Sequence, residues 1–234
     1  MDFMTEMLYQ RDVYGKTLVE IGRHNDNLVV CDADLSGSTR TALFAKEFPQ
    51  RFFNFGVAEQ NMMATAAGLA SCGKVVFVST FAMFASGRAW DQVRNTICYS
   101  DLNVKIVATH AGVTVGPDGA SHQALEDIAI LRAIPNMKII VPCDGPETQE
   151  AVLQAFGTPG PFYVRLGRAK VPTIENRLPF KLSEASLLRS GNDVTIVACG
   201  IMVLEALKAA EELAKMNISA RVLSMATVKP LDEG

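Results

Sequence analysis

The chain has 234 residues, of which 49% are hydrophobic and 20% are charged. This composition is typical of a folded globular protein and argues against a chain that is disordered throughout. The formal net charge is −3, which excludes an overall electrostatic attraction to nucleic acid or to an anionic membrane. The apolar runs are too short to span a bilayer and no basic-then-apolar leader opens the sequence, so we expect a cytoplasmic protein with no nucleic-acid or membrane partner.

Short runs rich in Val, Ile and Phe alternate with longer helical patterns over most of the chain. The runs predict strands over residues 28–34, 51–56, 74–80, 104–110, 137–142 and 161–166, and their nearly continuous apolar character suits strands covered on both faces. Helices are expected over residues 5–24, 59–71, 83–99, 124–133 and 146–156. The alternation predicts an α/β fold with a doubly wound, mostly parallel sheet and helices on both faces, in a domain of residues 1–175.

A second α/β unit follows a segment that we interpret as a linker. Residues 176–189 combine proline with mixed charge, and residues 190–234 contain a predicted strand (194–200), a helix (202–216) and another strand (218–225). One βαβ unit of this size has too small a core for a finished domain. We therefore expect this second domain to be incomplete and the chain to be truncated.

Polar loops follow the predicted strands, and ligands of parallel α/β sheets bind at the carboxyl ends of strands. In FGVAEQNMM, Glu59 stands at the start of an apolar helix, where the exposed N–H groups of a helix end favour its charge. Position alone fits a purely structural glutamate equally well. Its apolar neighbours Phe53, Phe55, Met62 and Met63 would favour the protonated acid by desolvation, as a general acid requires.

Phe81 and Phe84 follow the predicted strand KVVFVST. The pair fits a plain core contact, and it also fits a stacking wall for a flat heteroaromatic ring.

The loop THAGVTVGPDGASHQ carries His110, Asp118 and His122. It can be a surface loop built on turn residues, but polar groups concentrated above strand ends commonly serve a ligand. Their spacing matches no recognised zinc pattern, so we expect no metal bound by this chain. Forked arginine donors and one hydroxyl could hold a phosphate: Arg11, Arg165, Arg168 and Ser38.

Five stretches together resemble the pyrimidine-binding domain of the transketolase family: DADLSGS, FGVAEQNM, STFAMF, THAGVTVGPDGASHQ and RAIPNMKIIVPCDGPE. The resemblance covers about Arg11 to Arg168, and VTIVACG onward is similar to the start of the family's third, carboxyl-terminal domain. It implies the thiamine diphosphate-binding fold and a thiamine diphosphate-dependent transfer of a two-carbon ketol unit between phosphorylated sugars.

The resemblance gives several of these residues a role in binding the cofactor. Glu59 matches the family's glutamate that hydrogen-bonds N1′ of the aminopyrimidine ring and favours the imino form that activates the cofactor. Phe81 and Phe84 match the aromatic wall around that ring, and Asp34 matches an aspartate that links paired sites. Gly87 stands where the family often has another aromatic residue, so a thinner wall is expected here.

The resemblance also places the sugar substrate against the His/Asp loop. His110 and His122 are the expected catalytic residues together with Glu59, and Asp118 would contact a hydroxyl of the donor sugar. The expected ligands of the acceptor's phosphate are Arg11, Ser38, His110 and Arg165.

The sequence lacks the Gly-Asp-Gly motif and downstream Asn with which the family's upstream domain binds magnesium and the diphosphate. We therefore expect the carboxyl-terminal subunit of a split transketolase, whose amino-terminal partner subunit holds the magnesium and shares the thiamine diphosphate. Active sites of this family lie across a subunit interface, so a homodimer of this chain is also expected.

Three alternatives stay open. 1-Deoxy-D-xylulose-5-phosphate synthase shares the AEQ and DG-x-x-HQ patterns but typically lacks a histidine at the position of His110. The beta subunit of a 2-oxoacid dehydrogenase has a less similar His/Asp loop. A non-catalytic assembly subunit would retain the fold, although the joint presence of Glu59, Phe81, Phe84 and His122 argues against it.

Overall fold

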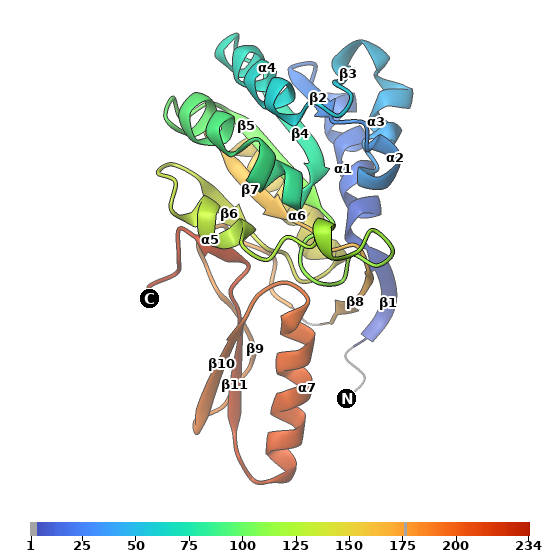
Figure 1. The fold of residues 1–234 in the computed structure, drawn as a ribbon. Helices are drawn as coiled ribbons and strands as arrows, with labels where there is room; N and C mark the ends of the chain where they lie inside the picture. The colour runs from blue at the N-terminus through green and yellow to red at the C-terminus, as the bar shows by residue number, and fades with distance from the viewer. Residues whose placement is uncertain (1–3, 176) are drawn as a thin grey trace.

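The computed structural model describes residues 4–175 and 177–234, and its main feature is a seven-stranded sheet with the order β12-β6-β7-β5-β4-β2-β3 (Figure 1). The strands are β2 (Leu28–Asp32), β3 (Phe52–Asn54), β4 (Val75–Phe81), β5 (Val104–Thr109), β6 (Lys138–Ile140), β7 (Phe162–Arg165) and β12 (Thr227–Lys229). All neighbours are parallel except β12, which pairs antiparallel with β6. The mostly parallel sheet confirms the predicted fold class.

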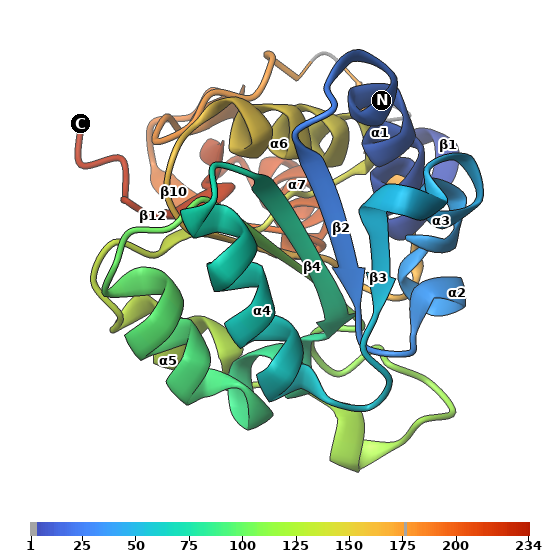
Figure 2. The ribbon, with the colours of Figure 1, turned by 90° about the horizontal axis from the view of Figure 1, so that it is seen from above.

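Helices cover both faces of this sheet, because its strands are apolar on both faces. One layer contains α4 (Glu59–Ser71), α5 (Asp127–Arg132) and two π-helical segments (Phe84–Arg88 and Gln92–Cys98). The other contains α1 (Gln10–His24), α3 (Ala42–Glu47) and α6 (Gly145–Gly157) (Figure 2). Within β2, Val29 and Cys31 pack toward the first layer and Leu28 and Val30 toward the second, as the two-residue period of a strand requires.

The amino-terminal helix is shorter than predicted. Residues 5–9 belong to β1 (Met4–Tyr9), which pairs antiparallel with β8 (Lys170–Ile174), and α1 begins only at Gln10. The helix prediction for these residues was wrong because the pairing partner lies far away in the sequence, where local periodicity cannot reveal it.

The predicted helix over 83–99 is present as the two π-helical segments rather than as a regular α-helix. The amide of Ala89 donates to the carbonyl of Phe84 at 3.3 Å, which is the i→i+5 pattern of a π-helix. Such segments occur frequently at functional sites.

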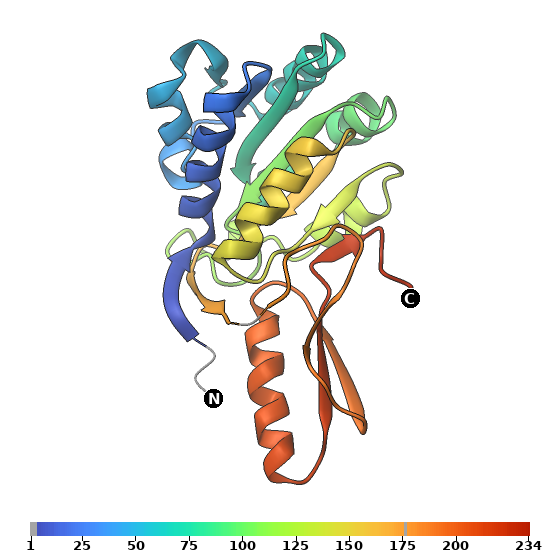
Figure 3. The same cartoon turned by 180° about the vertical axis from the view of Figure 1, so that it is seen from behind.

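The second unit is a three-stranded sheet with the order β10-β11-β9, packed on α7 (Met202–Lys215) (Figure 3). β10 (Val194–Ala198) and β11 (Ala220–Ser224) are parallel, as predicted for a βαβ unit, whereas β9 (Ser186–Arg189) is antiparallel to β11. β9 falls inside the segment interpreted as a linker, and β12 returns to the main sheet. The chain therefore passes between the two units twice, from β8 into β9 and from β11 into β12. The domain boundaries stay a prediction.

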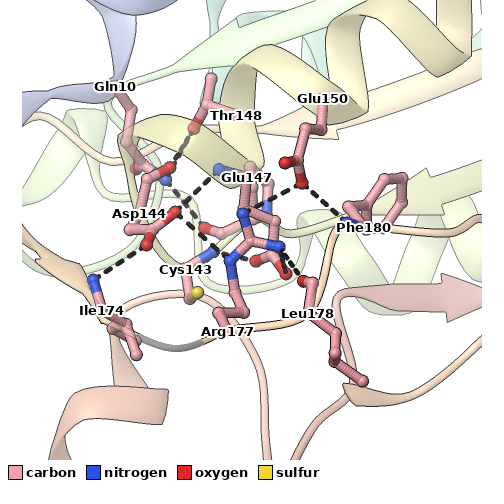
Figure 4. Close-up of polar contacts among 11 residues, drawn as sticks. Gln10, Cys143, Asp144, Glu147, Thr148, Glu150, Ile174, Arg177, Leu178 and Phe180 are labelled. Carbon is pink, nitrogen blue, oxygen red and sulfur yellow. Dashed lines mark hydrogen bonds and ion pairs between the residues drawn. The ribbon is translucent and has the colours of Figure 1, made fainter.

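A buried polar network fastens the segment after β8 to the amino terminus of α6 (Figure 4). Asp144 Oδ1 accepts from the amide of Glu147 at 2.8 Å, and Asp144 Oδ2 accepts from the amide of Ile174 at 3.0 Å. The Arg177 side chain is 5% exposed and places Nη2 3.0 Å from Glu150 Oε2. The segment that leads from β8 toward the small unit is thus held on α6 by charged groups, of which Asp144, Glu147 and Arg177 are shielded from water.

Candidate active site

The candidate site lies at the carboxyl ends of β4 and β5, where the loops of parallel strands meet. Phe81 ends β4 and His110 follows β5, and their rings stack with centroids 3.8 Å apart and an interplanar angle of 23°. Phe84 stacks on Phe81 at 6.2 Å and 14°, and His122 stands perpendicular to Phe84 at 5.2 Å and 83°. The structure therefore brings these four side chains together in what we call the ring cluster.

Glu59 is the first residue of α4 and is only 1% exposed. Met62 and Met63 on the same helix are fully buried, as the apolar pattern predicted. Phe53, in contrast, is 44% exposed on the edge strand β3. With this exposure Phe53 shields less apolar surface than the buried methionines do, and its part in desolvating the Glu59 carboxyl group stays a prediction.

Arg88 is the charged partner of Glu59, a pairing that was not predicted from the sequence. Its Nη1 donates to both carboxylate oxygens of Glu59 at 2.9 Å. Its guanidinium also lies over the Phe84 ring, 4.6 Å from the centroid. Phe84 and Arg88 are four residues apart, a spacing that places side chains on one helix face, so this spacing was a signal available in the sequence.

His110 is held in a defined orientation and is neutral at pH 7. It is 2% exposed, has a φ of +58°, and its Nδ1 lies 2.9 Å from the Thr109 hydroxyl oxygen. Left-handed backbone at a residue other than glycine is found at functional sites. Burial, and to a lesser extent the positive charge of Arg11, lower the pKa of His110 to about 4.

Three arginines lie close to one another, the arginine cluster: Arg11, Arg40 and Arg168. Two of them, Arg11 and Arg168, are close enough to His110 to lower its pKa. Arg11 Nη1 donates to the Ser38 carbonyl at 3.2 Å. Its Nε is buried and has no hydrogen-bond partner among the described residues. Burial lowers the pKa of Arg11, and the charges of the other two arginines lower it as well. Asp12, whose Oδ1 accepts from Arg40 Nε at 2.5 Å, offsets part of the repulsion between these like charges. A second anion held between the arginines would relieve the rest.

The loop after β5 approaches the arginine cluster through glycine. Gly116 has a φ of +84°, and a β-carbon at this position would lie 2.8 Å from Arg168 Nη1. Any other residue here would displace the guanidinium or the loop.

Arg165, predicted to hold a phosphate, is largely occupied by other partners. Its Nε donates to Asp127 Oδ2 at 2.7 Å, and its Nη2 donates to the Ala124 carbonyl at 3.2 Å. The same Asp127 oxygen accepts from the Tyr163 hydroxyl at 2.7 Å. Its role toward a substrate stays a prediction.

The two predicted aspartates lie at the surface, and a buried one went unnoticed. The exposed Asp34 has a φ of +63°, and its Oδ1 accepts from Asn54 Nδ2 at 3.3 Å. Asp118 is exposed on the loop after β5, close enough to raise the pKa of His110 slightly against the larger lowering effects. Asp32 is fully buried and accepts from the Thr39 hydroxyl at 2.7 Å, which orders the loop after β2.

Among the residues that the structure describes, no group of three or more His, Cys, Asp or Glu side chains is arranged to hold a metal ion. Within residues 4–175 and 177–234, no helix has both the length and the apolar character that a membrane crossing requires.

Comparison with known proteins follows the same division of the chain. The family model of the transketolase pyrimidine-binding domain matches residues 6–173, and that of the transketolase C-terminal domain matches residues 183–234. A putative transketolase C-terminal section from Methanocaldococcus jannaschii is 57% identical over 226 residues, which is 95% of this chain and 72% of that protein. The 6-deoxy-6-sulfo-D-fructose transketolase subunit SqwH from Clostridium sp. is 45% identical over 224 residues, which is 95% of this chain and 70% of that protein.

A solved structure described as a split gene transketolase, inactive beta4 tetramer, matches with a TM-score of 0.88 and 52% identity. The match covers 97% of this chain and 74% of that one. The family models, the identities and the fold agree, and the chain therefore belongs to the transketolase family.

Proposed function

We propose that this chain is the carboxyl-terminal subunit of a split transketolase, which transfers a two-carbon ketol unit between phosphorylated sugars with thiamine diphosphate as cofactor. The observation that carries the proposal is the buried carboxylate of Glu59, joined through Arg88 to a cluster of stacked phenylalanine and histidine rings. Transketolases generally use thiamine diphosphate and a divalent metal.

The residues of the site fit the aminopyrimidine half of this cofactor. A carboxyl group shielded from water forms strong hydrogen bonds, so Glu59 would hold the ring nitrogen N1′. Phe84 offers the face on which a flat heteroaromatic ring can stack, and Phe81, which is buried and stacked on His110, would support that wall from behind. Asp34 would connect paired sites. When bound, the cofactor supplies an electron sink for cleavage of a carbon–carbon bond. Magnesium and the diphosphate would be held by the amino-terminal partner subunit, which the similarity to a transketolase C-terminal section and to a split gene transketolase supports.

His110 and His122 would position and move protons on the sugar. A neutral imidazole donates through one nitrogen and accepts through the other. Since Nδ1 of His110 is paired with Thr109, Nε2 is the nitrogen that would contact the substrate. Asp118, exposed on the same loop, would accept a hydrogen bond from a donor hydroxyl.

The arginine cluster would bind the acidic group of the acceptor, together with Ser38 and Arg165. Arginine forks suit any tetrahedral oxyanion, and one relative is named for a sulfonated sugar. Acceptors with a phosphate and with a sulfonate should therefore both be assayed.

Exposed apolar side chains flank the site, which supports cover by other chains. Val57 is 73% exposed, Trp90 37%, Val113 64% and Leu125 60%. Each lies within three residues of Glu59, Arg88, His110 or His122 in the sequence, and large exposed apolar patches mark surfaces that another polypeptide covers. We propose that the amino-terminal subunit and a second copy of this chain bury them.

The decisive experiment is a coupled assay of the chain with its amino-terminal subunit, comparing Glu59→Gln with the wild type at saturating donor. The rate is expected to fall by about 10²–10⁴-fold, the usual contribution of an acid–base group. Glu212→Gln is the matched control, because this glutamate lies exposed on α7 and its described ion pair is with the equally exposed Lys215. An unchanged rate for Glu59→Gln would support an assembly role instead, and activity on pyruvate alone would support the synthase or dehydrogenase alternatives.

Calorimetry tests the dependence on the partner. The isolated chain is expected to bind thiamine diphosphate weakly and to show no turnover. Adding the amino-terminal subunit should raise the affinity for thiamine diphosphate and give measurable turnover. Tight binding by the isolated chain would contradict a shared cofactor site. Light scattering tests the homodimer, and a monomer at working concentration would contradict it.

A further inference from the structure

The contact between Arg88 and Glu59 has an unusual form. A single nitrogen, Nη1, lies 2.9 Å from both carboxylate oxygens, so it sits between them and uses the lone pairs that point toward each other. A second donor that approaches along this direction must displace the arginine. The side chain of Glu59 is 1% exposed, whereas that of Arg88 is 46% exposed.

The same guanidinium has a second contact, with the Phe84 ring at 4.6 Å from its centroid. A guanidinium is planar and delocalised, so it stacks on an aromatic face while it donates to a carboxylate at its edge. Arg88 thus makes two contacts at once: an edge contact to a buried acid and a face contact to a phenylalanine.

These are the two contacts that the aminopyrimidine ring requires under the proposed function, on which this inference rests. We propose that Arg88 is a placeholder for the cofactor ring, which it imitates in its flat shape and in the two groups that it contacts, and that it competes with the ring for Glu59 and Phe84. The competition keeps the buried carboxylate paired until the cofactor arrives. It makes cofactor binding an exchange of one partner for another.

The surroundings of Arg88 permit this exchange. Its neighbour Gly87 is exposed, and a β-carbon there would contact only Met83 Cε, at 3.7 Å. The family often has an aromatic side chain at this position, whereas glycine leaves open space beside Arg88 into which the guanidinium could move. Arg88 also ends a π-helical segment, where backbone hydrogen bonding is less regular than in an α-helix.

The test is a calorimetric titration of thiamine diphosphate and magnesium into the full chain assembled with its amino-terminal subunit. Three forms are compared: wild type, Arg88→Met and Arg88→Lys. Methionine keeps the unbranched stem but cannot donate, and we expect it to lower the Kd about tenfold, since a charged hydrogen bond and a cation–π contact no longer have to be broken. Lysine keeps the charge without the flat fork, and its Kd should lie between the other two.

Arg94→Met is the matched control, because Arg94 belongs to the next π-helical segment and lies over Trp90 instead of Phe84. Its Kd should equal that of the wild type. Melting curves of each variant identify any loss of folding, and a Glu59→Gln form shows whether Glu59 holds the ring at all.

The outcomes separate the two ideas. If Glu59→Gln weakens binding while Arg88→Met leaves it unchanged or weakens it, the placeholder is refuted and the proposed function stands. If the wild-type complex binds no thiamine diphosphate, the proposed function itself fails.

Discussion

Replacing Arg177 with methionine should destabilise the protein strongly, because it leaves buried carboxylates without their cation. Arg177 lies 3.0 Å from Glu150 Oε2, 3.8 Å from Glu147 Oε1 and 3.9 Å from Asp144 Oδ1, and it is 5% exposed. Removing one partner of a buried ion pair costs about 3–5 kcal/mol. The lower end of that range applies here, since both Asp144 and Glu147 keep backbone N–H donors.

The loss should also depend on pH. Burial raises the pKa of Glu147, although Arg177 partly opposes this effect. An acid whose pKa is higher in the folded state loses stability as the pH rises from its unfolded value of 4.5 through its folded value. Without Arg177 the pKa of Glu147 in the folded state would rise further. The free energy of unfolding should therefore fall more for Arg177→Met at pH 8 than at pH 5.

Urea denaturation followed by circular dichroism at these two pH values measures both effects. Arg23→Met is the control, because Arg23 makes a bidentate contact with Glu47 at 2.6 and 3.0 Å on the exposed surface, where ion pairs contribute little. If Arg177→Met were no more destabilising than this control, the buried network would not fasten the segment after β8 to α6. A greater loss at pH 5 than at pH 8 would refute the assignment of the effect to carboxylate charge.

Two further predictions concern buried bases. Burial lowers the pKa of Lys105 to about 7 from 10.5. Between these pH values the unfolded chain binds one more proton than the folded chain, so the free energy of unfolding should rise by up to about 2 kcal/mol from pH 7 to pH 9. Urea denaturation of Lys105→Met should show no such rise, and a rise that persists would contradict the assignment. His110 has a pKa lowered to about 4, so an NMR titration of its imidazole carbons should show a neutral ring down to about pH 5. Its contribution to the free energy of unfolding should be lost as the pH falls from 6.5 toward 4. A titration midpoint near 6.5 would show that the ring is not buried in solution.

Much of the fold follows from local sequence pattern. The strands of the main sheet are continuous apolar runs, and the helices between them have recognisable periods, so their places could be predicted. What could not be predicted depends on contacts between distant segments. β1 forms a strand because it pairs with β8, and β12 joins the main sheet because it pairs with β6. A propensity is overridden in this way whenever a distant edge offers hydrogen bonds.

The site shows the same division. Glu59 and the ring residues lie at strand and helix ends, where a pattern of polar residues after an apolar run indicates a ligand. Arg88 and Asp32 were missed for opposite reasons. The sequence around Arg88 is equally typical of a surface charge, and its pairing with Glu59 depends on where α4 places that carboxylate. Asp32 reads as the end of a strand, and its burial depends on the hydroxyl groups that the following loop folds back onto it.

Two of the arginines that pair with buried carboxylates, Arg177 and Arg88, differ in a way that separates architecture from function. Arg177 is 5% exposed and has three carboxylates within 4 Å, so no exchange of partners can occur without opening the junction. Arg88 is 46% exposed and serves one carboxylate, so water can replace it when it moves away. In the same urea experiment Arg88→Met should therefore cost less free energy of unfolding than Arg177→Met. The reverse order would mean that Arg88 holds the fold together, and a residue with that role cannot yield its place to a cofactor.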